Sequence, residues 1–299
     1  FGGLSGLEIS PDGRSLLAVT DKGLWFKGRL SYDKDDNLLS MSQGVLSSLN
    51  GPEGQALTRK RDRDSESLAM ADDGAIYVSF ERHHRILRYS APLDPDAIAI
   101  PIPTNFTTNS KNRGIEALTW LPGGCLLAIP EKVKAATENS TGENVPYSGL
   151  IEAHLWDQFS WQSLYLEPNG DFLPTGLSVT PEGDLLLLER SFSFFEGFKT
   201  SLRYFPAEEI FPGNTMQGKV LASFQAHTAI DNMEGISSRL GPNGETLIYL
   251  LSDDNLSFAQ DTLLLMFEFQ KQRKPAGLST AGCSKNKTAY SAALETKAF

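Results

Sequence analysis

The feature that most constrains the fold is a hairpin pattern that the 299-residue chain repeats five times. Each copy begins with a small or acidic residue, follows a short apolar strand to a turn with glycine, and returns along a second apolar strand to an acid. The leading apolar positions, which are Leu7, Leu68, Leu118, Leu177 and Ile236, lie 61, 50, 59 and 59 residues apart. This spacing is typical of propeller blades, although the repeats are slightly longer than usual.

The turns of the five copies contain the residues that a tight hairpin requires. Proline presets φ for a turn, and glycine accepts a positive φ. Further strand-like sequence follows the hairpins, as at 85–89 and 220–223, and supplies third and fourth strands. Four antiparallel strands repeated in this way indicate a propeller rather than a β-sandwich, which does not repeat one turn five times. The turns are Pro11-Asp12-Gly13, Asp72-Asp73-Gly74, Pro122-Gly123-Gly124, Pro181-Glu182-Gly183 and Pro242-Asn243-Gly244.

We therefore predict an all-β fold, a β-propeller of four-stranded blades over residues 1–269. Five repeats are recognisable, and the last lacks a clear fourth strand, so the sequence leaves open whether there are five or six blades. Residues 270–299 are polar with little apolar periodicity and predict a poorly ordered tail. Long loops are expected at 46–63 and 137–147, where a rigid scaffold often places binding residues.

Composition excludes several classes of protein. A net charge of −10 and a pI near 5.0 argue against nucleic-acid binding, which needs a basic face. No apolar stretch approaches the length of a membrane span. Cys125 lies in a strand-like run and Cys283 in the polar tail, so no disulfide is expected. The chain begins at Phe1 without a signal peptide, which suggests processing.

Acidic residues recur at the open ends of the hairpins. Residues equidistant from a turn face each other, so Glu66 is expected opposite Glu81 and Glu116 opposite Glu131. In two copies a hydroxyl, Ser5 or Thr175, takes the first place. If these hairpins form the inner strands of the blades, up to eight carboxylates meet at one mouth of the channel: Asp21, Glu66, Glu81, Glu116, Glu131, Glu189, Glu234 and Asp253.

Carboxylates gathered in this way repel one another unless they are protonated or bind cations. Calcium takes six to eight oxygen ligands in flexible geometry and suits acids spread over several blades, whereas zinc prefers closely spaced His and Cys. Glu66, Glu116 and Glu234 are the preferred ligands because they lead into the innermost strands. The alternative is that some acids form ion pairs between blades, since a basic residue follows the second acid in four copies.

Three of the basic residues that directly follow a second acid are candidates for holding an anionic substrate, namely Arg82, Lys132 and Arg190. His83 follows Glu81 closely and is a candidate acid or base. A serine-hydrolase triad is excluded because no Gly-x-Ser-x-Gly motif occurs in the required strand-turn-helix context.

Several of these motifs together resemble the phytase-like propeller family described as having esterase-like activity. The resemblance extends over about residues 1–269 and rests on Phe1-Gly2-Gly3-Leu4-Ser5-Gly6-Leu7, Asp64-Ser65-Glu66-Ser67-Leu68-Ala69, Gly114-Ile115-Glu116-Ala117-Leu118, Asn232-Met233-Glu234-Gly235-Ile236 and Ser252-Asp253-Asp254-Asn255. It implies a calcium-dependent hydrolase of phosphate or carboxylic esters, often exported to the periplasm or secreted. In such a site the cation polarises the ester while an unligated carboxylate acts as base, for which Glu116 and Glu81 are the candidates.

Three functions remain open at this point. The first is the metal-dependent ester or phosphoester hydrolase with a small-molecule substrate. The second is a lactonase of the gluconolactonase type, which holds one metal with a few acids and Asn. The third is a non-catalytic binding propeller whose acids bind structural calcium. The sequence does not indicate the oligomeric state.

Overall fold

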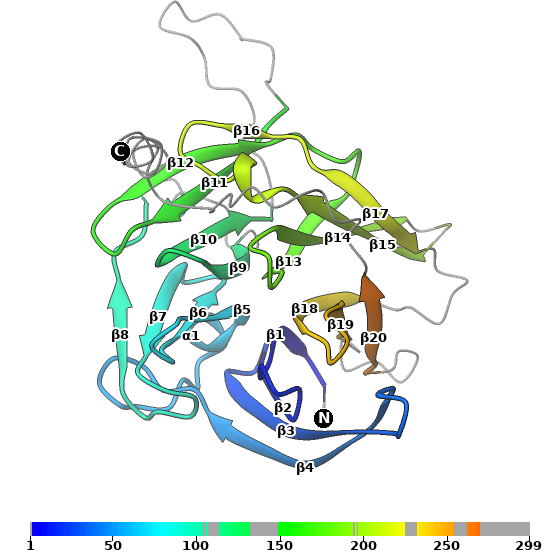
Figure 1. Cartoon of the computed structure of the whole chain (residues 1–299). Coiled ribbons are helices and arrows are strands. Elements are labelled where there is room, and N and C mark those ends of the chain that lie inside the picture. The colour runs from blue at the N-terminus through cyan, green and yellow to red at the C-terminus, as the bar shows by residue number, and fades with distance from the viewer. Residues whose placement is uncertain are drawn as a thin grey trace, which may run out of the picture.

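The structure is a computed structural model, and it describes residues 2–103, 106, 114–131, 149–193, 195, 197–224, 232–253 and 262–269. Five small sheets surround a central axis, which confirms the propeller and gives five blades (Figure 1). The first blade contains β1 (Leu4–Ile9), β2 (Ser15–Thr20), β3 (Leu24–Tyr32) and β4 (Leu38–Ser48), and the second contains β5 (Ser65–Met70), β6 (Ile76–Phe80), β7 (Arg85–Tyr89) and β8 (Ala97–Ile100).

The other three blades follow the same order from the axis outwards. The third contains β9 (Ile115–Leu121), β10 (Cys125–Pro130), β11 (Ile151–Trp156), β12 (Trp161–Leu166) and the short β16 (Thr215–Met216), which pairs in parallel with β12. The fourth contains β13 (Leu173–Val179), β14 (Leu185–Ser193), β15 (Gly197–Phe205) and β17 (Lys219–Phe224). In the part of the chain that the structure describes, the fifth has three strands, β18 (Met233–Leu240), β19 (Thr246–Ser252) and β20 (Leu264–Phe269).

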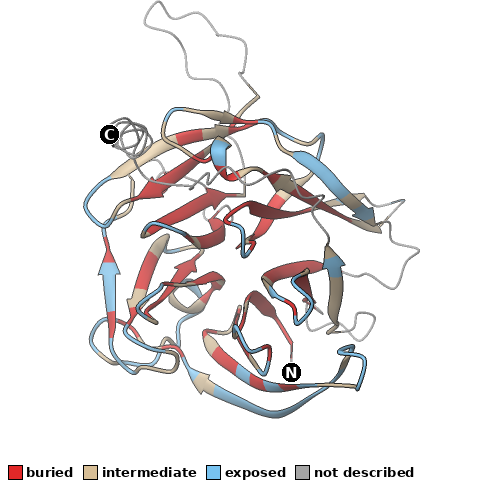
Figure 2. Cartoon of the chain, in the orientation of Figure 1, coloured by how far each residue is buried: buried red, intermediate tan, exposed pale blue. Residues whose placement is uncertain are grey.

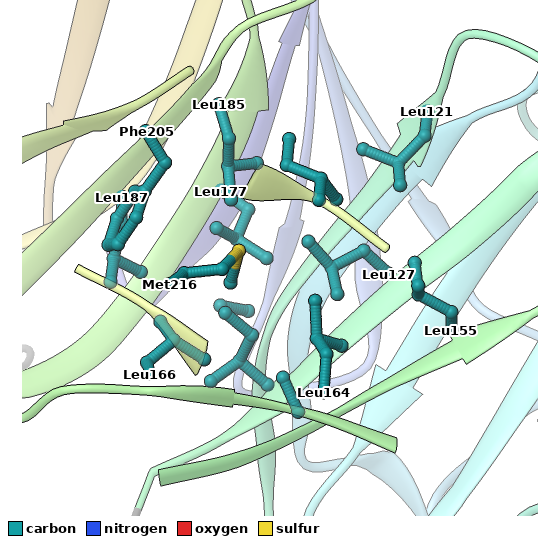
Figure 3. Packing of buried hydrophobic residues seen from close by; sticks show 14 of the residues in the cluster. Leu121, Leu127, Leu155, Leu164, Leu166, Leu177, Leu185, Leu187, Phe205 and Met216 are labelled. Atoms are coloured by element: carbon teal, nitrogen blue, oxygen red, sulfur yellow. The ribbon is translucent and has the colours of Figure 1, made fainter. Parts of the chain in front are cut away.

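Apolar side chains fill the five spaces between neighbouring blades, and the buried residues concentrate on the inner strands (Figure 2). Between the third and fourth blades, Leu127 and Leu155 pack with Leu177 and Leu187 (Figure 3). A fully buried Leu contributes about 1.5–3 kcal/mol to stability. The cluster between the fifth and first blades, which includes Leu4 and Tyr249, closes the ring.

The innermost strands β1, β5, β9, β13 and β18 each pack against the next around the axis. Polar side chains satisfy the backbone N–H groups along these inner edges. Ser237 Oγ accepts from the N–H of Ile9 at 3.0 Å, and Ser67 Oγ accepts from that of Leu118 at 3.1 Å. Neighbouring blades are therefore joined by hydrogen bonds at the axis as well as by apolar packing.

Gly6 lies on β1 directly against the backbone of β5. Its φ is +59°, and a Cβ there would lie 2.8 Å from the backbone nitrogen of Leu68. We expect Gly6→Ala to lower the free energy of unfolding by about 2–4 kcal/mol in urea titrations, because backbone strain and a backbone clash combine. Gly74→Ala is the matched control, since its φ of +84° imposes strain but no atom lies within 4 Å of its Cβ. Equal losses for the two variants would contradict this packing.

Glu8 lies on β1, and its Oε1 accepts from the N–H of Met70 at 3.2 Å. Burial raises the pKa of Glu8 from 4.5 to about 7. The folded state therefore favours the neutral carboxyl, and this contribution to stability is present below pH 4.5 and lost as the pH rises through 7. We expect Glu8→Gln to raise the free energy of unfolding at pH 8 by roughly 1–2 kcal/mol more than it does at pH 5. This value allows for the partial exposure of the Glu8 side chain to solvent. Urea titrations at both pH values test this, and Glu53→Gln on the exposed surface should not change the difference.

The structure also bears on the predicted loops and on the cysteines. The loop expected at 46–63 is wrong at both ends, since β4 extends through Ser48 and Lys60–Arg63 form the short helix α1. Cys125 is buried in β10 and disulfide-bonded, so the expectation of an unpaired thiol is also wrong, while Cys283 lies outside the described residues. The loop at 137–147 and the tail at 270–299 lie outside the described residues as well. No helix in the described part of the chain is long and apolar enough to cross a membrane.

Candidate functional site

The acids that come first in the repeat, Glu66, Glu116 and Glu234, lie where the pairing at the start of the innermost strands is irregular. The register of the hairpin shifts by one residue there, which is the signature of a β-bulge. In four blades the extra residue is Glu66, Glu116, Thr175 or Glu234. Because a bulge turns its extra side chain out of the regular alternation, three blades present a glutamate at the same mouth of the channel.

The acids that come second in the repeat lie directly after the second strands β2, β6, β10 and β19, and they are Asp21, Glu81, Glu131 and Asp253. In each case a backbone N–H donates to the carbonyl of the residue just before the innermost strand, from Asp21 to Gly3, from Glu81 to Asp64, from Glu131 to Gly114 and from Asp253 to Asn232. Glu81 is thus opposite Asp64 and Glu131 is opposite Gly114, so the expectations that they face Glu66 and Glu116 are wrong. The reason is the bulge, which shifts the facing residue and cannot be read from distances to the turn.

In the fourth blade the equivalent residue is Arg190, which pairs with Leu173, whereas Glu189 pairs with Pro174 one position earlier. The sequence alignment that grouped Glu189 with the other second acids is therefore off by one residue. Glu189 is fully buried, and its carboxylate accepts from Arg203 Nη1 at 3.1 Å and from Asn169 Nδ2 at 2.8 Å. Its two partners already satisfy it, so we leave it out of the proposed metal site.

The second blade brings three carboxylates together. Asp64, Glu66 and Glu81 each offer an oxygen, and these atoms lie within 4.8 Å of one another. Burial, together with the charges of Glu116, Glu81, Glu234 and Asp64, raises the pKa of Glu66 well above its ordinary value. Burial and Asp64 raise the pKa of Glu81 to about 7. Desolvation and the neighbouring carboxylates therefore favour the neutral forms of Glu66 and Glu81 when no cation is bound.

Glu116 extends the acidic group into the third blade. It is 5% exposed, and no hydrogen bond or salt bridge joins its carboxylate to another described residue. Burial and the charge of Glu131 raise its pKa well above the ordinary value, although Arg190 opposes the shift. A buried carboxylate without a donor is costly unless it is neutral or meets a cation, so Glu116 is a carboxyl that is either protonated or balanced by a cation.

Glu234 has protein partners of its own. Arg190 donates to its Oε1, and Asn232 Nδ2 donates to the same oxygen at 2.7 Å. Arg190 also donates to Asn232 Oδ1 at 2.7 Å. An ion pair between the fourth and fifth blades, the alternative considered from the sequence, is thus present at this position.

The remaining acids complete the mouth. Asp21 Oδ1 is buried without a hydrogen-bond partner among the described residues, and burial raises the pKa of Asp21. Asp253 is 8% exposed, and Glu131 contributes to the charge that acts on Glu116. Metal binding by these three remains a prediction.

The basic and histidine candidates are distributed differently. Arg82 donates through Nε to Asp64 Oδ2, so it lies beside the three-carboxylate group. His83 is mostly exposed, and its Nδ1 lies 3.1 Å from Asp62 Oδ1. A catalytic role for His83 therefore stays a prediction, and Lys132 lies outside the described residues.

Two residues of the mouth were missed as candidates. Asp64 belongs to the three-carboxylate group, and Asn232 supports Glu234 and Arg190. Each lies two residues before a bulge glutamate, in Asp64-Ser65-Glu66 and Asn232-Met233-Glu234. This shared spacing was the available signal, because side chains two residues apart in a regular strand lie on the same face of the sheet.

Comparison with known families agrees with this arrangement of residues. The sequence model of the phytase-like family, described as "Esterase-like activity of phytase", matches residues 1–256. The chain belongs to this family. The match ends shortly after Asp253, so it spans all the inner hairpins that form the mouth. No curated protein sequence matches the chain.

Solved structures similar to the chain are distant propellers. The aldose sugar dehydrogenase from Streptomyces coelicolor in its PQQ-bound form has 15% identity and a TM-score of 0.45, with 89% of this chain and 81% of that chain covered. The virginiamycin B lyase from Staphylococcus aureus with quinupristin has 12% identity and a TM-score of 0.39, with 91% and 71% covered. YCF48 bound to D1 peptide has 10% identity and a TM-score of 0.40, with 84% of this chain covered and 62% of that chain, less than two thirds of its length. Similarity this low supports no conclusion about this chain.

Proposed function

We propose that the protein is a divalent-metal-dependent hydrolase of phosphate or carboxylic esters, with calcium as the metal and the acidic mouth as the site. The observation that supports it most is the group formed by Asp64, Glu66 and Glu81, whose oxygens lie within 4.8 Å of one another. Membership in the phytase-like family supports the same class of reaction.

The residues present fit a hard divalent cation. All three are carboxylates, which calcium and magnesium prefer, and the group contains no His or Cys that would favour zinc. The raised pKa of Glu66 and of Glu81 indicates negative charge that is not fully compensated within the protein. When bound here, a divalent cation would polarise the ester and stabilise negative charge that develops on its oxygens.

Other residues of the mouth would complete the reaction. Glu116 has the burial and the raised pKa of a general base, and it would accept the proton of the attacking water. Arg82, at the rim beside Asp64, would contact an anionic substrate group. The acids also exclude free anions, so an anionic substrate is expected to enter together with the metal.

We also propose that the protein is exported from the cytoplasm. Family resemblance suggests the periplasm or the exterior, and the disulfide-bonded state of Cys125 supports an oxidising compartment. Measuring the free thiol content of the native protein, with and without reductant, tests this part on its own.

Hydrolysis of p-nitrophenyl phosphate and p-nitrophenyl acetate with calcium tests the activity. We expect turnover of at least one of them, its loss on chelation, and a decrease of about 100-fold or more in kcat for Glu116→Gln, the size of effect typical for removal of a general base. Glu53→Gln, on the exposed surface, is the matched control and should retain full activity.

Other outcomes lead to the other two functions. Turnover of a lactone but of neither aryl ester would replace the proposal with a lactonase. A calcium-dependent melting temperature without turnover of any of these substrates would replace it with a binding propeller. Activity that persists after chelation would contradict the metal requirement.

A further inference from the structure

Arg190 interrupts the acids of the mouth. In the other four blades the residue after the second strand is Asp21, Glu81, Glu131 or Asp253. In the fourth blade the register places Arg190 at this position, opposite Leu173. A cationic side chain therefore takes a place that the repeat otherwise gives to a carboxylate.

The contacts of Arg190 are those of a fixed counter-ion. Its Nη1 donates to Glu234 Oε1 and, at 2.7 Å, to Asn232 Oδ1, while Asn232 Nδ2 donates back to the same glutamate oxygen at 2.7 Å. The side chain of Arg190 is 24% exposed. Three side chains from two blades thus hold one another in place, and the preorganised guanidinium loses little further freedom.

The charge of Arg190 acts on several acids at once. Burial alone would lower its pKa, but Glu234, Glu116, Glu131 and Glu66 raise it overall. The cation beside the three-carboxylate group, Arg82, lies nearer the surface and pairs with Asp64. Glu234 thus has a cation in direct contact, whereas every cause that acts on the pKa of Glu66 raises it.

We propose that Arg190 fills, as a built-in cation, the place that a second metal ion would take, so that the mouth binds a single divalent cation at Asp64, Glu66 and Glu81. This inference rests on the proposed function, since it assumes that the mouth binds a metal. A site with one metal and one arginine has its two positive charges on the second and fourth blades, which flank the blade of Glu116. The arginine is then a positioning residue for Glu234 of the fifth blade.

The number of bound calcium ions tests the inference directly. By isothermal titration calorimetry we expect one ion for the wild-type protein and two for Arg190→Gln, because the oxygens of Glu234 and Asn232 that Arg190 occupied are then free to bind a cation beside Glu116. Arg190→Lys keeps the charge and should bind one ion. Arg88→Gln removes an arginine that pairs with Asp73, a residue of the turn between β5 and β6, and should also bind one.

A second measurement keeps the test decisive if Arg190→Gln does not fold without calcium. If this variant folds only with calcium, equilibrium dialysis after refolding should still give two ions, and circular dichroism follows the fold. Two ions in the wild-type protein, or one in folded Arg190→Gln, would overturn the inference. No bound ion in the wild-type protein would instead contradict the metal requirement of the proposed function, so the two failures are distinguishable.

Discussion

Replacing Arg203 by methionine is expected to lower the free energy of unfolding by about 3–5 kcal/mol, the cost typical of leaving a buried charge without its partner. Arg203 is 3% exposed and Glu189 is fully buried. The guanidinium donates to Glu189 Oε1 at 3.1 Å, to the carbonyl of Glu167 at 2.9 Å and to that of Gln217 at 2.5 Å. The variant leaves all three acceptors without this donor.

Urea titrations at pH 7 measure the effect, and a matched arginine supplies the control. Arg88→Met breaks an ion pair with Asp73 that is largely exposed, so its cost should be at most about 1 kcal/mol. Because Glu189 is the charge left behind, Arg203→Met combined with Glu189→Gln should recover part of the loss. Similar losses for Arg203→Met and Arg88→Met would contradict the structural role given to Glu189.

Replacing Glu66 by glutamine is expected to have opposite effects in the absence and presence of calcium. Without metal the variant should be more stable at pH 7, since burial and the charges of Glu116, Glu81 and Glu234 disfavour the ionised form of Glu66. With calcium the stabilisation should largely disappear, because the cation loses one of its three carboxylates. We expect calcium affinity to fall about 10- to 100-fold, as affinity follows the number of charged ligands.

Thermal unfolding with and without calcium measures both effects. Saturation of the wild-type site at 1,000 times its Kd would add about 4 kcal/mol to stability. Glu53→Gln should match the wild-type protein in both conditions, since it lies on the exposed surface. A Glu66→Gln variant that is destabilised without metal, yet shows the full calcium effect, would contradict the role of Glu66 as a ligand.

The sequence predicted the propeller because its turns and spacing are local and repeated. Pro11-Asp12-Gly13 and its counterparts each specify a hairpin without help from the rest of the chain. The repeat also placed Glu66, Glu116 and Glu234 at equivalent positions, which the structure confirms. Whether they bind metal remains a prediction.

What the sequence missed depends on register and on partners distant along the chain. The bulge that makes Asp64 rather than Glu66 the residue opposite Glu81 leaves no mark in residue spacing alone. Glu189 and Arg190 are adjacent, so only strand pairing decides which of them takes the repeat position. The partnership of Glu189 with Arg203 links residues 14 apart on neighbouring strands, and the pairing of those strands decides it.

Anomalous diffraction from crystals grown with calcium, recorded at long wavelength, tests the central claim most directly. We predict one peak at the mouth, within the usual calcium–oxygen distance of about 2.3–2.6 Å of carboxylate oxygens from Asp64, Glu66 and Glu81. A mouth without a peak at saturating calcium would contradict the account.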